Sequence, residues 1–534
     1  MWLNAWWARQ DLNPEPDGYE PSALTIELQA PTRCSGYSNS RVCAIGQMML
    51  TQNLTPQAAV DQLIELHAKA TASLKSCLER YFATRQAPTP AERSSFCYPQ
   101  LRVTYESQGV QPSISRAFAK FQGPGTYVTT ITQPAHFRRY LVDQLSYLVK
   151  DYAASIQVGV SLQEIPYPYV LDKGDDLGGE NTKAVELALH FPVPRLDLVG
   201  DEIADGNWDH MPAHPLPLAM FDAVRVDYSL KRIQHYTGTH WRDMQPWILL
   251  TNYHRYVDQF IVWGVSQLSV ESSYESLHLP GGGTIVRGMD PGTIAKIIEG
   301  SLWHRYQMPG YHLKKRDGMG GGVTLVNIGV GPPNAKTMTD HLAVLRPHCW
   351  LMIGHCGGLR QSQRIGDYVL AHGYLRQDNI LDDVVPPEIP IPALAEVQVA
   401  LQQAAAAVTG ESGEALKARL RTGTVVTNDD RNWELRWSQE RKRINLSRAI
   451  AVDMESGTVA AQGYRFRVPY GTLLCVSDKP LHGEIKLPGA ANAFYDRAVS
   501  EHLMIGLAAL DRMRGELSQL HSRKLRSFDE PPFR

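Results

Sequence analysis

The sequence predicts an α+β part followed by a larger α/β part, whose central mixed sheet is flanked by helices. Three observations support this. From Pro246 onward, short apolar runs typical of buried strands alternate with helical patterns, the order expected of a mostly parallel or mixed sheet. Before residue 171, helices and strands follow no such order. Between them, residues 171 to 220 are rich in glycine and proline and predict the domain boundary.

Length and composition exclude several classes of protein. A chain of 534 residues predicts about two to four domains. A net charge of -2 gives no excess of cations for nucleic acid or a membrane surface, and no run approaches the ~18 apolar residues that span a bilayer. Seven cysteines without a Cys-x-x-Cys pair indicate reduced thiols in the cytoplasm and no metal site.

The first 48 residues mix proline, asparagine and serine without periodicity and predict a disordered tail. Met48 and Met49 stand directly before the first clear element, so a second hypothesis is that translation begins there. Residues 49–215 then form the α+β part. Thr55 and Pro56 start its first helix as N-cap and first helical residue. Strands are expected at 101–105, 114–121 and 126–132, and a helix from Pro134 to Leu148.

Residues 216–534 form the α/β part. A helix is expected at 222–236, and the sequence does not assign it to the α+β part or the α/β part. After it, buried apolar runs predict strands, and periodic runs predict helices. The strands are expected at 247–250, 323–328, 349–353 and 423–427, with a further candidate at 367–371, and the helices at 257–263, 334–345, from 393 and at 494–513.

The stretch from Arg448 to Pro480 carries the strongest functional signal. Its apolar runs 449–452 and 472–476 predict two buried strands, and Asp453, Glu455 and Asp478 follow their ends. Ligands of open α/β sheets bind at the carboxyl ends of strands, so these acids predict a shared pocket. The alternative is that each carboxylate caps the following helix.

Two glycine-rich stretches follow predicted strands. Gly329-Val330-Gly331 lacks the third glycine of a dinucleotide fingerprint, so it indicates a tight turn that lets the backbone approach some ligand. In Gly354-His-Cys-Gly-Gly358, backbone amides are expected to face an anion or a sugar. His355 is then either a base or phosphate donor, or a helix-start histidine bonded to backbone.

Two further positions have competing interpretations. Trp433, in the polar run after the strand at 423–427, would either stack on a base or pack in a core. Lys479 belongs to a group of basic residues that follows Asp478, and such a group is either a solvated face or part of the site.

These residues resemble a known superfamily. Val326-Asn-Ile-Gly-Val-Gly-Pro, Met352-Ile-Gly-His-Cys-Gly-Gly-Leu, Gly366-Asp, Val452-Asp-Met-Glu-Ser and Val476-Ser-Asp occur in the order found in nucleoside phosphorylases and nucleosidases. With the preceding α+β part, the chain from about Met49 onward resembles the bacterial AMP nucleosidases. The resemblance implies a catalytic domain of nucleoside-phosphorylase type and hydrolysis of AMP to adenine and ribose 5-phosphate.

The resemblance also implies roles for individual residues. Asp478 would be the general acid on the purine, kept protonated by burial near Glu455, and Ser477 would position it. Glu455 would accept the ribose hydroxyl protons, and Met454 would pack under the sugar. Arg255, with His355 and Lys479, would bind the 5′-phosphate.

One departure bears on the nucleophile. Where phosphorylases carry a phosphate-binding arginine, this chain has Met352, whose thioether cannot bind an anion, so water is expected to attack. The alternatives are a phosphate-dependent purine nucleoside phosphorylase and a catalytically silent nucleotide sensor.

The resemblance further implies regulation and assembly. The α+β part would be regulatory, with MgATP as allosteric activator and inorganic phosphate as inhibitor. The chemistry itself would require no cofactor. AMP would be the small-molecule substrate of a cytoplasmic homohexamer that binds neither nucleic acid nor a membrane.

Overall fold

The computed structural model describes residues 53–107, 118–171, 184–207, 215–316, 321–484, 492–517, 520, 525–527 and 530–534. The chain divides into two compact units, Met1–Gln47 and Met48–Arg534, and only the second contains described residues. The expected N-terminal tail, residues 1–48, therefore lies outside the described part.

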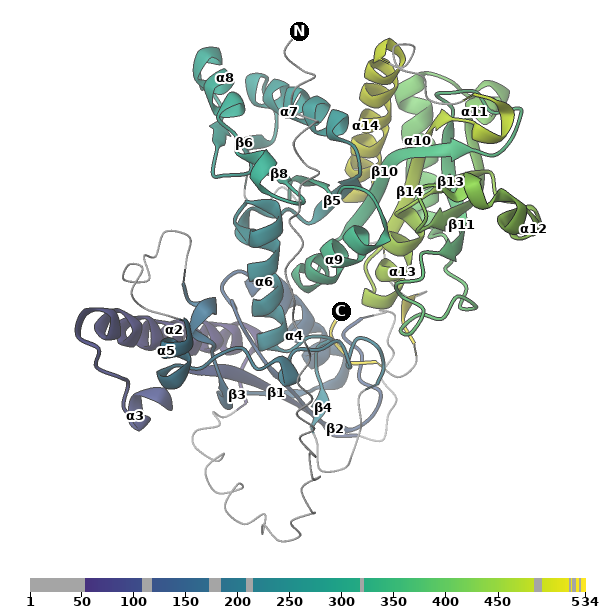
Figure 1. The fold of residues 1–534 in the computed structure, drawn as a ribbon. Helices are drawn as coiled ribbons and strands as arrows, with labels where there is room; N and C mark the ends of the chain where they lie inside the picture. Colours follow the sequence, from purple (N-terminus) through teal and green to yellow (C-terminus); the bar gives the residue numbers. More distant parts are fainter. Residues whose placement is uncertain are drawn as a thin grey trace, which may run out of the picture. The chain divides into compact units, whose positions relative to one another are not determined.

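A four-stranded sheet lies in the first part of the second unit (Figure 1), with strand order β3-β1-β2-β4. The strands are β1 (Cys97–Tyr105), β2 (Gly125–Thr130), β3 (Ser155–Glu164) and β4 (Leu216–Pro217), and the helices are α2 (Pro56–Thr84), α3 (Pro90–Arg93), α4 (Arg138–Tyr152) and α5 (Ala184–His190). Helix α2 packs on β1, β3 and α4. This arrangement confirms the predicted α+β architecture.

Helix α2 begins where the sequence predicts. The hydroxyl of Thr55 accepts a hydrogen bond from the backbone N–H of Ala58, and Pro56 occupies the first helical position. The strands expected at 101–105 and 126–132 correspond to β1 and β2. The strand expected at 114–121 is wrong for its described residues, 118–121, which form no strand. The helix expected from Pro134 starts four residues later, after a turn.

The second sheet has ten strands in the order β13-β12-β11-β14-β10-β5-β9-β8-β6-β7, and β13 also pairs with β10. That pairing closes β10, β14, β11, β12 and β13 into a ring. The sheet mixes parallel pairs, such as β10 with β14, and antiparallel pairs, such as β10 with β13. The strands are β5 (Trp247–Thr251), β6 (Tyr274–His278), β7 (Thr284–Val286), β8 (Gly310–Lys315), β9 (Val323–Asn327), β10 (Cys349–Gly358), β11 (Tyr368–Gln377), β12 (Leu420–Asn428), β13 (Ala451–Asp453) and β14 (Tyr470–Asp478).

Helices cover both faces of this sheet, which confirms the predicted α/β class. Figure 1 shows α7, α10 and α14 on one side and α9 and α13 on the other. Their bounds, with those of the remaining helices, are α6 (Ala223–Thr237), α7 (His254–Ser269), α8 (Pro291–Glu299), α9 (Pro332–Leu342), α10 (Ala395–Thr409), α11 (Gly413–Arg419), α12 (Trp437–Ser447), α13 (Ser456–Phe466) and α14 (Asn492–Gly515). Among the described helices, none is long and apolar enough to cross a membrane.

The largest difference from the sequence-based expectation concerns residues 354–358. They were expected to form a glycine-rich turn, but they continue strand β10, which runs to Gly358. The end of β10 has strand partners on both sides, because Gly357 lies opposite Asp478 of β14 and Val452 of β13. These partners keep the chain extended where its glycines alone would indicate a turn.

The last described residues connect the two sheet regions. Phe533 is fully buried in the core formed by α2, α4 and the four-stranded sheet. Its N–H donates to the carbonyl of Leu218 at 2.9 Å. Arg534 donates from its backbone N–H to Gln144 at 3.3 Å and from its guanidinium to the carbonyl of Pro347 at 2.8 Å. Pro347 lies two residues before β10, so these last residues contact both sheet regions.

Candidate active site

Three strand ends meet at the predicted site. Gly357, near the end of β10, lies between Asp478 of β14 and Val452 of β13 in the strand register. Glu455 follows β13 by two residues and is the N-cap of α13. The acids expected to share a pocket therefore stand at the ends of strands that both pair with β10.

Glu455 is fully buried and is held by two donors. The side-chain amide of Asn252 donates to Oε2 at 2.7 Å, and the backbone N–H of Gly331 donates to Oε1 at 2.6 Å. Burial and the nearby carboxylate of Asp453 raise the pKa of Glu455 to about 8, although both hydrogen bonds oppose the shift. The site thus holds a carboxyl that titrates near neutral pH.

The backbone brings these donors to Glu455. Asn252 directly follows β5, and Gly331 lies in the turn from β9 to α9 with φ +108°, a conformation that favours glycine. The predicted tight turn at Gly329–Gly331 is confirmed, and its backbone approaches Glu455. Gly354 permits the close position of Asn252, because a Cβ there would lie 2.8 Å from Asn252 Oδ1.

For Asp453 the structure agrees with the helix-capping alternative. Its Oδ1 accepts a hydrogen bond from the hydroxyl of Thr427 at 2.7 Å, and its Oδ2 accepts the N–H of Ser456 at 2.8 Å. The second bond caps the first turn of α13. Burial raises the pKa of Asp453, and the hydrogen bonds oppose that shift.

Asp478 is the last residue of β14 and is partly exposed. The hydroxyl of Ser477 lies 2.6 Å from Asp478 Oδ1 and donates to it. The same hydroxyl lies 3.3 Å from the carbonyl of Cys356 on β10. Met454 lies between Asp453 and Glu455 in the loop after β13 and is partly buried. Ser477 is therefore in a position to orient Asp478.

The histidine and arginine expected to bind phosphate come from two neighbouring elements. His355 lies within β10, so its interpretation as a helix-start histidine is wrong. Its ring centroid is 4.8 Å from that of Tyr253 and 5.5 Å from that of Tyr256. Arg255 lies in the first turn of α7, three residues after Asn252, and is partly exposed.

The side chains of Lys479 and Trp433 make internal contacts. Lys479 is buried, and its ammonium donates to the carbonyl of Gln363 at 2.7 Å and pairs with Glu484 at 2.5 Å. Trp433 is 7% exposed and packs in a small core cluster that includes Val426 and Val452.

Met352 lies in the middle of β10 and is fully buried. It pairs with Leu250 of β5 and Thr472 of β14 in the strand register. The position that carries a phosphate-binding arginine in phosphorylases is thus part of an apolar core here.

The contacts of Asn252 and Gly331 with Glu455 were not predicted from the sequence. Each lies more than a hundred positions from Glu455, with separations of 203 and 124 residues. The strand-to-helix turn was a signal for Gly331, but nothing local pointed to Asn252.

Both parts of the chain match known protein families. Residues 58–215 match the family "Bacterial AMP nucleoside phosphorylase N-terminus", and residues 304–511 match the phosphorylase superfamily. The AMP nucleosidase of Escherichia coli (strain K12) is 55% identical over 484 residues, which cover 90% of this chain and 99% of that protein.

Two other similarities cover less of the chain. Uridine phosphorylase of Thermococcus kodakarensis is 26% identical over 144 residues, or 26% of this chain and 48% of that protein. The crystal structure of AMP nucleosidase from Bacteroides thetaiotaomicron is 26% identical and covers 55% of this chain and 98% of that one, with a TM-score of 0.39.

Proposed function

This chain belongs to the AMP nucleosidase family, and we propose that it hydrolyses the N-glycosidic bond of AMP with Asp478 and Glu455 as its two working carboxyl groups. The products are adenine and ribose 5-phosphate. The observation that carries the assignment is the buried Glu455, held by Asn252 and Gly331 beside the ends of β10 and β14.

Asp478 is the proposed general acid. Breaking the bond between the ribose C1′ and the purine N9 leaves the electron pair on the purine and positive charge on the ribose. A proton from Asp478 to the imidazole nitrogen of the purine neutralises the leaving group, an effect typically worth about 100-fold to 10,000-fold. Ser477, which donates to Oδ1, fixes the orientation of the carboxyl group.

Glu455 is the proposed ligand of the ribose hydroxyl groups. To accept both hydroxyl protons it must be ionised, whereas its pKa of about 8 keeps most of it protonated at pH 7 in the free protein. Hydroxyl donors of AMP add to Asn252 and Gly331 and favour the ionised form. AMP binding is therefore coupled to release of a proton.

Water is the proposed nucleophile. It adds to C1′ and forms the new C–O bond, and its released proton restores the acid form of Asp478. Support comes from Met352, which supplies no charge for phosphate and is packed in the core.

The remaining contacts are proposals for the substrate pocket. Arg255 and His355 bind the 5′-phosphate, Met454 packs under the ribose, and Trp433 contacts the purine. Support for Arg255 comes from its place three residues after Asn252. For Lys479 the fixed contact to Gln363 points instead to a positioning role.

We also propose that the N-terminal part regulates the enzyme, with MgATP as activator and inorganic phosphate as inhibitor. The protein is proposed to be a homohexamer in the cytoplasm.

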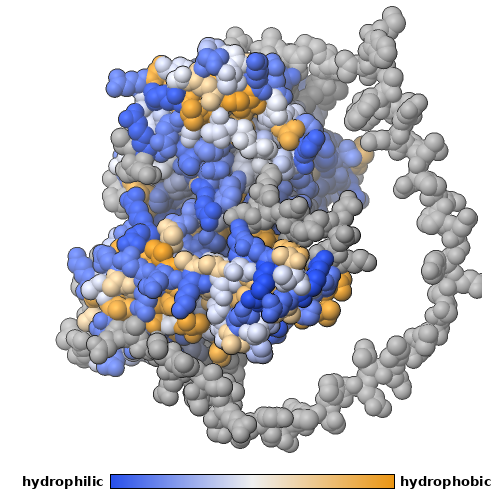
Figure 2. Space-filling view, turned by 90° about the vertical axis from the view of Figure 1, so that its left-hand side faces the viewer, coloured by the Kyte–Doolittle hydropathy of each residue, from blue (hydrophilic) through white to orange (hydrophobic). Residues whose placement is uncertain are grey.

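Support for assembly comes from four exposed apolar residues, Val160 and Leu162 on edge strand β3 and Val185 and Leu189 on α5. On the face shown in Figure 2, hydrophobic patches interrupt the hydrophilic surface. Analytical ultracentrifugation with Leu162→Lys tests the assembly.

The reaction is tested with AMP in phosphate-free buffer. Hydrolysis predicts release of adenine with ribose 5-phosphate as the other product, at a rate that does not require phosphate. Adenine release that depends on phosphate, with ribose 1,5-bisphosphate as the other product, would instead establish phosphorolysis.

A further inference from the structure

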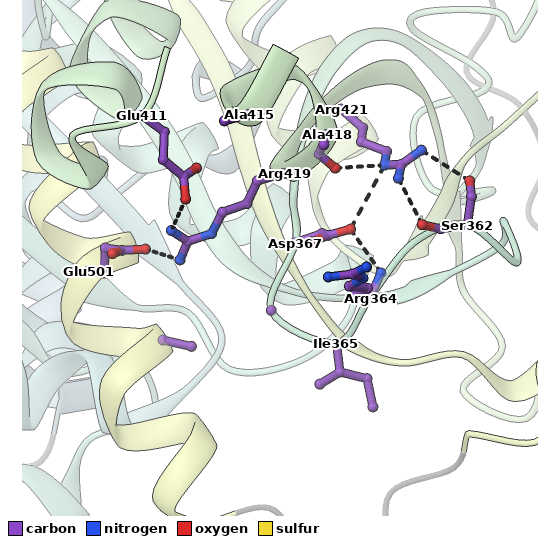
Figure 3. A pocket seen from close by; sticks show the side chains of 12 residues that line it. Ser362, Arg364, Ile365, Asp367, Glu411, Ala415, Ala418, Arg419, Arg421 and Glu501 are labelled. Atoms are coloured by element: carbon purple, nitrogen blue, oxygen red, sulfur yellow. Dashed lines mark hydrogen bonds and ion pairs between the residues drawn. The ribbon is translucent and has the colours of Figure 1, made fainter. Parts of the chain in front are cut away.

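The pocket drawn in Figure 3 is lined by neither Glu455 nor Asp478. It has a volume of about 520 Å³, within the range typical of small-molecule sites. Its walls come from the loop between β10 and β11, from α11 with the start of β12, and from α14. None of the residues given a role in AMP hydrolysis lines it.

Charged side chains of both signs line this pocket, and most are already paired. Arg419 lies between Glu411 and Glu501, as Figure 3 shows. Arg421 donates to the carbonyl of Ser362 at 2.8 Å and to its hydroxyl at 3.0 Å, and it lies 3.8 Å from Asp367.

Arg364 differs from the other two arginines. Its backbone N–H donates to Asp367 at 2.8 Å, but its exposed guanidinium makes no hydrogen bond or ion pair with any residue that the structure describes. Five N–H donors thus remain available at the pocket wall. A guanidinium with a second arginine nearby suits the oxygens of a phosphate group.

The other walls indicate what the phosphate would be attached to. Ile365, Ala415, Ala418 and Ala498 give the pocket an apolar side. A cavity of about 520 Å³ exceeds what a lone phosphate fills, and apolar walls suit a carbon-containing body. The carboxylates of Glu411 and Glu501 can accept hydrogen bonds from hydroxyl or amino groups of such a body.

The pocket loop is connected to the strand that ends in Asp478. Gly366 donates its N–H to the carbonyl of Val476, and Val476 donates its own to the carbonyl of Asp367, both at 2.9 Å. Beyond Asp478, the ammonium of Lys479 donates to Gln363 at 2.7 Å. The loop is therefore fixed to the chain two residues before Asp478 and one residue after it.

We propose that this pocket binds a phosphate-bearing small molecule through Arg364 and Arg421, and that its occupancy shifts Asp478 through the loop of residues 360–367. Anion oxygens held by Arg364 compete with Asp367 for Arg421, and the backbone of Asp367 is paired with Val476. The kinetic half of this proposal rests on Asp478 as the general acid, whereas the binding half does not.

The experiment titrates inorganic phosphate and phenyl phosphate, at constant ionic strength, into the full-length protein. Calorimetry measures binding, and steady-state assays with AMP separate kcat from KM. Arg364→Gln is the test variant, because its guanidinium holds no structural contact among the described residues. Arg441→Gln, which removes an exposed arginine of α12, is the matched control.

We expect phenyl phosphate to bind wild type and to change kcat, and Arg364→Gln to weaken this binding at least tenfold and remove the effect on kcat. Arg441→Gln is expected to match wild type. Tighter binding of phenyl phosphate than of inorganic phosphate supports an organic phosphate, and equal binding supports free phosphate as the ligand. Undiminished binding by Arg364→Gln overturns the site. A change in KM alone, which indicates competition at the active site, overturns the coupling to Asp478.

Discussion

Glu455 combines complete burial with two hydrogen-bond donors, and its proposed role as ribose ligand predicts that AMP binding depends on pH. Its pKa in the free protein is about 8, and the proposed ribose contact requires the ionised form. Affinity for AMP is therefore expected to rise up to about tenfold per pH unit between pH 6 and 8. Above pH 8 affinity should level off.

This expectation is best measured by calorimetry in the Asp478→Asn background, where AMP survives the titration. The matched protein is the double variant with Glu455→Gln. This double variant should bind AMP more weakly. Its affinity should not rise with the ionisation of residue 455 and should vary with pH only through the AMP phosphate. The same pH dependence in both proteins would remove Glu455 from the ribose site.

In the proposed mechanism Asp478 acts in the transition state, so its replacement should affect turnover more than binding. For Asp478→Asn we expect kcat to fall by about 100-fold to 10,000-fold with KM nearly unchanged. Stopped assays of adenine release measure both constants. Ser477→Ala, which removes only the positioning hydroxyl, should lose less. A kcat close to that of wild type for Asp478→Asn would assign the acid to another group.

At the level of single residues, the sequence predicted that these acids follow strand ends and missed the groups that hold Glu455. Glu455 and Asp478 stood out because each closely follows an apolar strand run, and strand ends are where sites form. Asn252 could not be found, because its contact with Glu455 joins two segments that meet only in the folded sheet.

Strand β10 illustrates how an element positions a site residue. Gly354 leaves room for Asn252, so Gly354→Ala should displace its amide and remove one donor from Glu455. A hydrogen bond to a charged group is worth about 1.5 to 3 kcal/mol, which predicts roughly 10-fold to 100-fold weaker AMP binding.

Gly373→Ala in β11 is the matched control, because a Cβ there would meet only Thr424 at 3.5 Å, an ordinary contact. Binding is measured in the Asp478→Asn background. If Gly354→Ala bound AMP as tightly as the control, Asn252 would not be needed to hold Glu455.

Elements were predicted best where a local pattern sufficed. The N-cap Thr55 and the apolar stripe behind it located α2, and uniform apolar runs located β5, β9 and β14. Residues 354–358 were predicted as a turn because they contain three glycines. They form a strand because Gly357 pairs with Val452 and Asp478. Pairing between distant strands is decided by tertiary structure, which a window of sequence does not contain.

At the scale of the whole described unit, the C-terminal residues Phe533 and Arg534 connect the two sheet regions. Phe533→Ala should lower the free energy of unfolding of the N-terminal region by about 3 to 5 kcal/mol, because it empties a fully buried ring site. Urea unfolding followed by tryptophan fluorescence and limited proteolysis measures the change.

Leu435→Ala, at a side chain that is 86% exposed, is the control and should change stability by less than about 0.5 kcal/mol. An equally small effect of Phe533→Ala would mean that these C-terminal residues are not needed to hold the N-terminal core together.

The ring of β10, β14, β11, β12 and β13 has a consequence for the order of folding. The pair that closes the ring joins Gly357 to Val452. Bringing residues so far apart in sequence together costs conformational entropy before the new contacts contribute stabilising free energy. Strand β13 leads directly into Glu455, so the pairing of β13 with β10 helps to place this carboxyl. We therefore expect catalytic activity to appear late during refolding, after most of the secondary structure has formed.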